Sequence, residues 1–279
     1  MADEIAITEN SVDMFAERPR APRPDEFKFI RYQLDKNTAR LTLNRPEHNL
    51  LNEAMLRELA AGIEEAGAIS DVKLIILDSA CKVFSGGIDL GEYTHQRVFQ
   101  VLDAFESAFI AMLEISKPVL VVVNGPAVGG GSELAAIGDV VVATPRAKFA
   151  QPEVTIGMFP PLAATVLPHL IGPKQALELV LTGETVTAER ALELGMVNRV
   201  VPEEKLTATV SQLSNQIAAQ SGPVLAMAKR AVLGGMGKSL RDAMHQSIHI
   251  FLNELYGLED AQEGLRAVVE RRKPQWKNR

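Results

Sequence analysis

The chain has 279 residues, 47% of them hydrophobic, which is enough for one large core or one core with a small appendage. Its formal net charge is −6, which argues against a nucleic-acid surface, since such a surface needs clustered basic charge. The single cysteine, Cys81, excludes an internal disulfide and fits a reducing compartment such as the cytoplasm, and no apolar run reaches the length of a membrane span.

Residues 1–26 are first acidic and then rich in proline and arginine. Asp3 and Glu4 argue against a signal or transit peptide, and no apolar segment of the kind that a signal peptide needs is present. We therefore predict that this segment is a flexible extension or one that packs against another subunit.

The chain then alternates between strand and helix patterns. Period-two alternation predicts a hairpin of residues 27–34 and 39–44, and apolar residues at helical spacing predict a helix over 53–69, capped by Asn52. A buried strand over 73–78, a loop over 79–87 and an amphipathic helix over 98–115 follow. Such an order is typical of an α/β protein.

Residues 118–157 carry the candidate chemistry. A buried strand over 119–123 runs into three glycines, 129–131, and a short helix that carries Glu133. Two further extended pieces then lead to Glu153. The pattern thus places two carboxylates near the glycine backbone at the N-terminus of a helix. The unpaired N–H groups there suit an oxygen that gains negative charge.

The glycines have rival readings. A phosphate-binding loop would need a lysine where Gly131 stands. Leu134 stands where a dinucleotide fingerprint needs its last glycine, and also where a serine nucleophile elbow needs one. The glycines could also serve only to let a helix pack closely on a strand, but the two nearby carboxylates favour an active site.

From residue 173 onward the pattern is helical, and residues 221–223 (Ser-Gly-Pro) interrupt it between two predicted helices. We predict a boundary near residue 202, which divides an α/β core (27–201) from a C-terminal helical subdomain (202–279). The predicted helices cover residues 175–181, 187–194, 202–220, 224–233, 240–256 and 259–271. His245 and His249 lie four residues apart and could form a metal pair, but no third ligand at metal-site spacing is evident, so we predict no metal site.

Three segments, VNGPAVGGGSELA, FSGGIDL and FAQPEVTIGMFP, resemble the signature segments of the enoyl-CoA hydratase/isomerase (crotonase) superfamily. The similarity runs from about residue 27 to residue 276. It implies a crotonase-like α/β core of ββα spiral repeats that binds acyl-CoA thioesters. It also implies that two backbone N–H groups stabilise an enolate-like anion.

Carried over residue by residue, the resemblance implies that the amides of Ile88 and Gly130 form the oxyanion hole. Glu133 and Glu153 match the two glutamates of the hydratases. The resemblance further implies substrate binding by Gly87, by Lys82 near the CoA phosphates, and by Arg271, which would reach the CoA of a neighbouring subunit.

The expected reaction adds water to an α,β-unsaturated acyl-CoA or removes it, and the sequence does not fix the direction. By resemblance, Glu153 gives the proton to the α-carbon and Glu133 activates the water. Neither a metal nor a cofactor beyond the substrate's own CoA is required. A Δ3,Δ2-enoyl-CoA isomerase and an acyl-CoA thioester hydrolase stay open as alternatives, because both could use the same oxyanion hole. A scaffold that binds CoA or an RNA-binding side role is disfavoured by the acidic balance and the intact pair of glutamates.

The chain departs from the common hydratase pattern at residues 160–165, PPLAAT, where prolines and alanines replace glycines. Together with the C-terminal segment YGLEDAQEGLRAVVERRKPQWK, this most resembles the cyclic dienoyl-CoA hydratases. It predicts a stiffer acyl pocket lined by apolar groups from this segment.

The resemblance and the apolar content of residues 240–258 also predict a homotrimer, or a hexamer of paired trimers, assembled through the C-terminal helices.

Overall fold

The computed structural model of the protein describes residues 20–279. Most of the predicted N-terminal extension, residues 1–19, therefore lies outside the described residues. Its last part includes a single 3₁₀ turn, Pro24–Glu26, that leads into the first strand.

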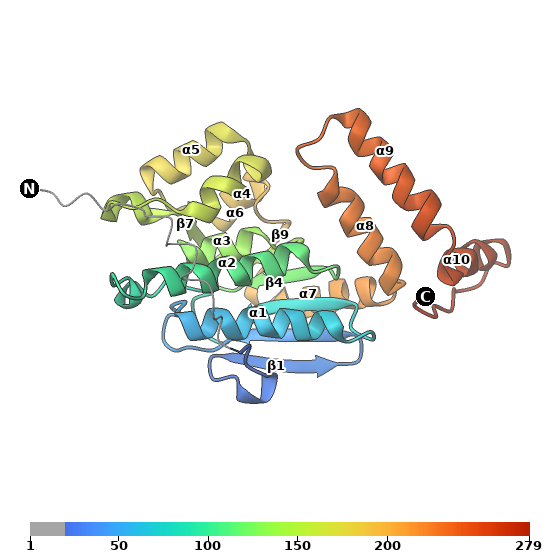
Figure 1. Ribbon diagram of the computed structural model, residues 1–279, viewed down its shortest axis with the longest axis horizontal. Helices are drawn as coiled ribbons and strands as arrows, with labels where there is room; N and C mark the ends of the chain where they lie inside the picture. The colour runs from blue at the N-terminus through green and yellow to red at the C-terminus, as the bar shows by residue number, and fades with distance from the viewer. Residues whose placement is uncertain (1–19) are drawn as a thin grey trace, which may run out of the picture.

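The centre of the molecule is a six-stranded sheet in the order β1-β2-β3-β4-β6-β9 (Figure 1). β1 and β2 form the antiparallel hairpin expected from the sequence, and all the other pairs are parallel. All five residues of β4 are buried, as is typical of a strand covered on both faces. The strands are β1 (Ile30–Asp35), β2 (Thr38–Leu43), β3 (Leu74–Ser79), β4 (Val119–Val123), β6 (Val140–Ala143) and β9 (Arg199–Val200).

Alternate residues of these strands pack against helices on opposite faces of the sheet. On one face, α1 (Glu53–Ala68) and α2 (Val98–Glu114) contribute to the main core. Asn52 caps α1, since its side chain accepts the N–H of Met55 at 3.0 Å. On the other face, α7 (Glu203–Ala218) packs with Val210 and Leu213 on a second cluster.

A smaller three-stranded sheet holds the segments that follow β4. β5 (Ala127–Val128) pairs in parallel with β7 (Lys148–Ala150), which pairs in antiparallel with β8 (Val186–Thr187). Two helices, α3 (Gly130–Ala136) and α6 (Ala188–Leu194), contact its strands, and α4 (Pro161–Ile171) packs on α3 and on α5 (Pro173–Thr182). The glycines after β5 thus lead directly into α3, which contacts both β5 of this sheet and β4 of the larger one.

The last helices extend away from the body of the molecule (Figure 1). They are α8 (Gly222–Gly234), α9 (Leu240–Ile250), a wider π-helical turn (Phe251–Leu255) and α10 (Glu259–Val269). A largely buried ion pair of 2.7 Å between Lys229 and Asp139 ties α8 to the core. The division at residue 202 stays a prediction, and α7, which follows it, packs on the sheet rather than with α8–α10.

The described chain is therefore a mixed α/β protein with a C-terminal helical region, as the sequence predicts. Within residues 20–279, no helix is both long enough and apolar enough to cross a membrane.

Candidate active site

A cavity of about 580 Å³ lies where the loop after β3, the turn after β5 and the segment after β7 meet. Four of the predicted site residues line it together: Gly87, Ile88, Glu133 and Glu153. Gly130 adjoins it, since a Cβ added there would lie 3.1 Å from Ile88 Cγ1. Most of the remaining wall is apolar and comes from Leu90, Val98, Leu102, Phe105, Val128, Pro152, Ile156, Met158, Phe159 and Pro161.

Two glycines let the backbone approach closely at this point. Gly87 has φ +95°, and a Cβ there would lie 2.8 Å from the carbonyl oxygen of Val128. Gly129 has φ +50°, and a Cβ there would lie only 2.4 Å from Glu153 Oε1. The glycines therefore do more than pack a helix on a strand, because they open the space that the Glu153 carboxylate occupies.

Both expected oxyanion amides are free of protein acceptors. Leu51 forms a parallel bridge with Ile88, in which Leu51 donates to the carbonyl of Gly87 and accepts from the N–H of Asp89. In such a bridge the N–H of Ile88 itself points away from Leu51. Gly130 is the first residue of α3, so its N–H has no acceptor inside the helix. Among residues 20–279, neither N–H has a hydrogen-bond partner.

Glu133 is held on α3 with its side chain almost fully buried. The N–H of Ala163, in the first turn of α4, donates to Glu133 Oε1 at 2.6 Å. Burial raises the pKa of the Glu133 carboxyl to about 7, helped by the charge of Glu153 and opposed by the N–H groups of Ala163 and Leu162. A carboxyl with such a pKa can exchange a proton near neutral pH.

Glu153 lies in the 3₁₀ turn Pro152–Ile156, directly after β7. Burial raises the pKa of its carboxyl above the usual value. Its Oε2 is buried and has no hydrogen-bond partner within the described part of the chain. Two carboxyl groups with raised pKa thus lie in one cavity, one anchored by a helix N-terminus and one with a free oxygen.

Sequence reasoning missed two contributors to this site. One is the backbone of Ala163, whose contact with Glu133 spans 30 residues and involves no side chain at position 163. The other is Tyr93, which lines the cavity five positions after Ile88. Burial raises the pKa of its phenol, and the charges of Glu133 and Glu153 add to the shift. Its proximity to the FSGGIDL segment is the one signal that could have singled it out.

One prediction about the acyl pocket is partly wrong. Pro161 lines the cavity as expected, and the preceding Phe159 does so too, but Ala163 and Ala164 do not. Because α4 begins at Pro161, helical geometry turns Ala163 into the core and Ala164 to the surface. The alanines therefore shape the helix that holds Glu133 rather than the cavity wall.

Lys82 and Arg271 are not brought to this cavity. Lys82 is exposed on the loop before Gly86, and Arg271 is exposed just after α10. In Figure 1, α10 lies at the opposite side of the molecule from α2 and α4, which border the cavity. Arg271 does not line the cavity, and its expected role at the CoA of a neighbouring subunit stays a prediction.

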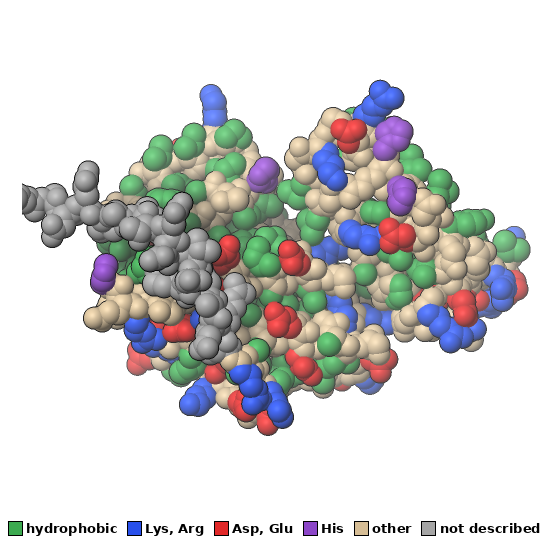
Figure 2. Space-filling view, in the orientation of Figure 1, with side chains coloured by type: hydrophobic (Ala, Val, Ile, Leu, Met, Phe, Trp, Pro, Cys, Tyr) green, Lys and Arg blue, Asp and Glu red, His purple; other side chains and the backbone are tan. Residues whose placement is uncertain are grey.

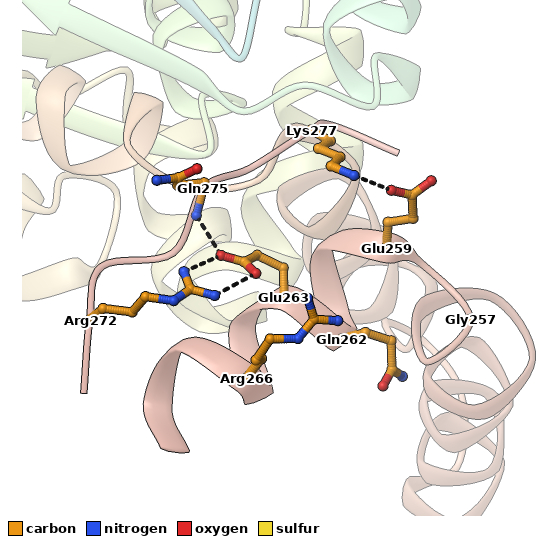
Figure 3. Close-up of a pocket in the computed structure, with 8 residues that line it drawn as sticks. All are labelled: Gly257, Glu259, Gln262, Glu263, Arg266, Arg272, Gln275 and Lys277. Carbon is orange, nitrogen blue, oxygen red and sulfur yellow. Dashed lines mark hydrogen bonds and ion pairs between the residues drawn. The ribbon is translucent and has the colours of Figure 1, made fainter. Parts of the chain in front are cut away.

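A second hollow of about 540 Å³ lies against α10 and is lined by charged residues (Figure 3). Its charged side chains largely pair with one another. Two guanidinium nitrogens of Arg272 donate to the Glu263 carboxylate at 2.6 and 2.9 Å, and the ammonium of Lys277 donates to Glu259 at 3.0 Å. The two acids that line it, Glu259 and Glu263, have lowered pKa values, because Lys277 and Arg272 bind their carboxylates. This hollow is thus a structural junction between α10 and the C-terminal tail.

In residues 20–279, no group of three or more histidine, cysteine, aspartate or glutamate side chains could hold a metal ion. His245 and His249 are both exposed on α9.

The chain is similar to known proteins over most of its length. The family model described as enoyl-CoA hydratase/isomerase matches residues 33–279. A Dictyostelium discoideum protein named "Probable enoyl-CoA hydratase, mitochondrial" is 35% identical over 86% of this chain and 87% of its own length. The "2,3-dehydroadipyl-CoA hydratase" of Escherichia coli K12 is 34% identical over 86% of this chain and 94% of its own.

Solved structures agree with the sequence comparison. An enoyl-CoA hydratase subunit from Geobacillus kaustophilus superimposes with a TM-score of 0.85 at 32% identity. The match covers 91% of this chain and all of that one. The crotonase-like fold predicted from the motifs is confirmed.

Proposed function

The chain belongs to the enoyl-CoA hydratase/isomerase family and is a hydro-lyase of the enoyl-CoA hydratase type, and we propose that Glu133 and Glu153 add water across the double bond of an enoyl-CoA. One observation carries the proposal: two carboxyl groups with raised pKa share one cavity with two unpaired amides. Water addition needs all four, because it needs a base, an acid and a site for the developing oxyanion.

In the proposed reaction, the thioester oxygen accepts the N–H groups of Ile88 and Gly130. Glu133 removes a proton from water, whose oxygen bonds to the β-carbon while the double-bond electrons move toward the thioester. Glu153 then gives a proton to the α-carbon. Each amide is worth about 3 kcal/mol of barrier where it meets the developing charge. No further cofactor enters this scheme.

An isomerase that shifts the double bond needs only one acid, and a thioester hydrolase needs water at the carbonyl carbon rather than the β-carbon. The test is an assay of the purified protein with crotonyl-CoA in water labelled at its oxygen atom. Label on the β-carbon hydroxyl supports hydration. Free CoA with labelled carboxylate would identify a hydrolase, and conversion of but-3-enoyl-CoA to crotonyl-CoA without label would identify an isomerase.

For the acyl group, we propose a cyclic conjugated dienoyl thioester. Aromatic and proline side chains support this, because Phe105, Phe159 and Pro161 line the cavity and suit a flat ring. None of the residues described as lining the cavity is a lysine or arginine, so a second carboxylate on the acyl group would find no cation there. A kcat/KM for cyclohexa-1,5-diene-1-carbonyl-CoA above that for crotonyl-CoA supports the ring. The opposite order leaves hydration standing and removes the ring.

We further propose that the protein assembles as a homotrimer, or a hexamer of paired trimers, through α8–α10. Large apolar side chains are exposed along α9 and its π-helical turn, including Leu240, Met244, Ile248, Phe251 and Leu252. Figure 2 shows hydrophobic side chains along the outer side of this region. An exposed apolar surface of this kind marks an interaction site. Assembly would also allow Arg271 and Lys82 to contact a CoA bound between subunits.

A cytoplasmic location remains part of the proposal, while the Dictyostelium relative carries "mitochondrial" in its name.

A further inference from the structure

We propose that the Arg45–Asp89 ion pair is a positioning device that aims the N–H of Ile88 at the thioester oxygen. This inference rests on the proposed function, because it assigns Ile88 to the oxyanion hole. It adds two residues that do not line the cavity.

Arg45 joins the two segments that make up the bridge at Ile88. Its Nη2 binds Asp89 Oδ2 at 2.7 Å, and its Nη1 donates to the carbonyl of Leu50 at 2.8 Å. Leu50 precedes Leu51, and Asp89 follows Ile88, so one guanidinium fixes both partners of the bridge Leu51–Ile88. A planar fork that makes two directed hydrogen bonds holds geometry in a way that a lysine cannot.

The second carboxylate oxygen of Asp89 also has a hydrogen-bond partner. Its Oδ1 accepts the N–H of Gly91 at 3.1 Å and caps the 3₁₀ turn Leu90–Glu92. The ion pair is mostly shielded from water, with 26% of the Arg45 side chain and 20% of the Asp89 side chain exposed. The Arg45 guanidinium also lies 5.8 Å above the Phe29 ring.

The direction of the Ile88 N–H depends on this arrangement. The peptide plane between Gly87 and Ile88 contains this N–H, and its carbonyl accepts the N–H of Leu51 at 2.8 Å, so the orientation of the plane follows the position of Leu51. Arg45 holds that position through the carbonyl of Leu50 and through Asp89, whose own N–H donates to Leu51. A misplacement of about 1 Å at a reacting group can cost on the order of 10²-fold in rate.

The test uses Asp89→Asn and Arg45→Met, with Asp78→Asn and Arg40→Met as matched controls. Arg40 and Asp78 form a comparable ion pair between β2 and β3, away from the cavity. We expect kcat for hydration to fall about tenfold or more in the Arg45 and Asp89 variants with KM within about threefold. In the controls, kcat stays at the wild-type value. The double variant should be no slower than the slower single one, since both act through one pair.

A second readout does not depend on hydration. Butyryl-CoA, which has no double bond to hydrate, is bound with an isotope-labelled thioester carbonyl, and the infrared carbonyl band is recorded. Hydrogen bonds from the oxyanion hole lower this band in the wild type, and we expect the shift to shrink in Asp89→Asn and to persist in Asp78→Asn. If Asp89→Asn does not fold, Arg45→Lys is measured in its place. An unchanged band and unchanged kcat in the Arg45 and Asp89 variants would overturn the inference, while a wild type without hydration but with the band shift would overturn only the proposed reaction.

Discussion

The N–H of Ala163 donates to Glu133 Oε1 at 2.6 Å, so the first turn of α4 holds one of the two acids of the site. A helix N-terminus favours the ionised carboxylate, while burial favours the neutral acid. The two effects oppose each other, and burial prevails, because the pKa of Glu133 is raised to about 7. The site thus contains a carboxyl group that is close to half-ionised at neutral pH.

The first prediction concerns both acids. Glu133→Gln and Glu153→Gln should each lower kcat by about 10² to 10⁴-fold, because each removes a proton donor or acceptor from the reaction. Acyl-CoA binding should stay within about tenfold, since most of the affinity comes from the CoA moiety. Steady-state hydration rates and titration with the hydrated product measure the two effects. Glu64→Gln, at an exposed position of α1, is the control. Near-wild-type turnover in either variant would exclude the two-acid mechanism.

The second prediction links Glu133 to stability. Its pKa is about 7 in the folded protein and near 4.5 in the unfolded chain, so between these values the folded state binds more protons. The extra stability is therefore fully present below pH 4.5 and is lost as pH rises through 7. Glutamine mimics the neutral acid and keeps an acceptor for Ala163. We expect the thermal unfolding of Glu133→Gln and of the wild type to match most closely below pH 4.5, the variant to become relatively more stable as pH rises from 4.5 to 7, and the difference to level off above pH 7. A difference that does not vary with pH would contradict the assignment.

The third prediction uses the space beside Glu153. Gly129→Ala places a methyl group 2.4 Å from Glu153 Oε1 at a residue with φ +50°. We expect kcat to fall about 10²-fold as the carboxylate moves, with a stability cost of about 1 to 3 kcal/mol from the strained backbone. Gly257→Ala is the matched control, since a Cβ there meets nothing within 4 Å and no positive φ is involved. Full activity in Gly129→Ala would mean that the Glu153 position is not critical.

The fourth prediction concerns assembly. Light scattering at micromolar concentration should give the mass of a trimer or a hexamer. Leu252→Asp, in the π-helical turn, should shift the protein to smaller species, because it places a charge in the proposed apolar contact. Leu34→Asp, at a similarly exposed leucine on β1, should leave the mass unchanged. A monomeric wild type would remove the proposed interface.

Much of the fold follows from local pattern. The buried run of β4, the hairpin β1–β2 and the cap of α1 by Asn52 are each encoded by adjacent residues. Helix ends were predicted to within a few residues, but the predicted helix 240–256 is instead α9 followed by a π-helical turn. The π-helical turn, with hydrogen bonds from i to i+5, covers only five residues, which is too short to establish a different apolar period in the sequence.

The site itself was predictable only where a motif marks it. Gly87, Ile88, Glu133 and Glu153 lie in segments that resemble the family's, and the structure places all four around one cavity. The contacts that hold them are long-range: Arg45 and Asp89 are 44 residues apart, and Ala163 and Glu133 are 30 apart. Neither pair forms a periodic pattern, so neither could be found from the sequence.

Gly125 sets a limit on how this enzyme can be redesigned. A Cβ there would lie 2.0 Å from the carbonyl oxygen of Lys82, so the turn after β4 and the loop after β3 fit together backbone to backbone. A larger residue at Gly125 would therefore displace the loop after β3, which carries the amide of Ile88. Leu102 on α2, Met158 and Phe159 line the cavity with side chains that are not fully buried in the core. A directed-evolution library aimed at new acyl groups should therefore vary Leu102, Met158 and Phe159 and leave Gly125 unchanged.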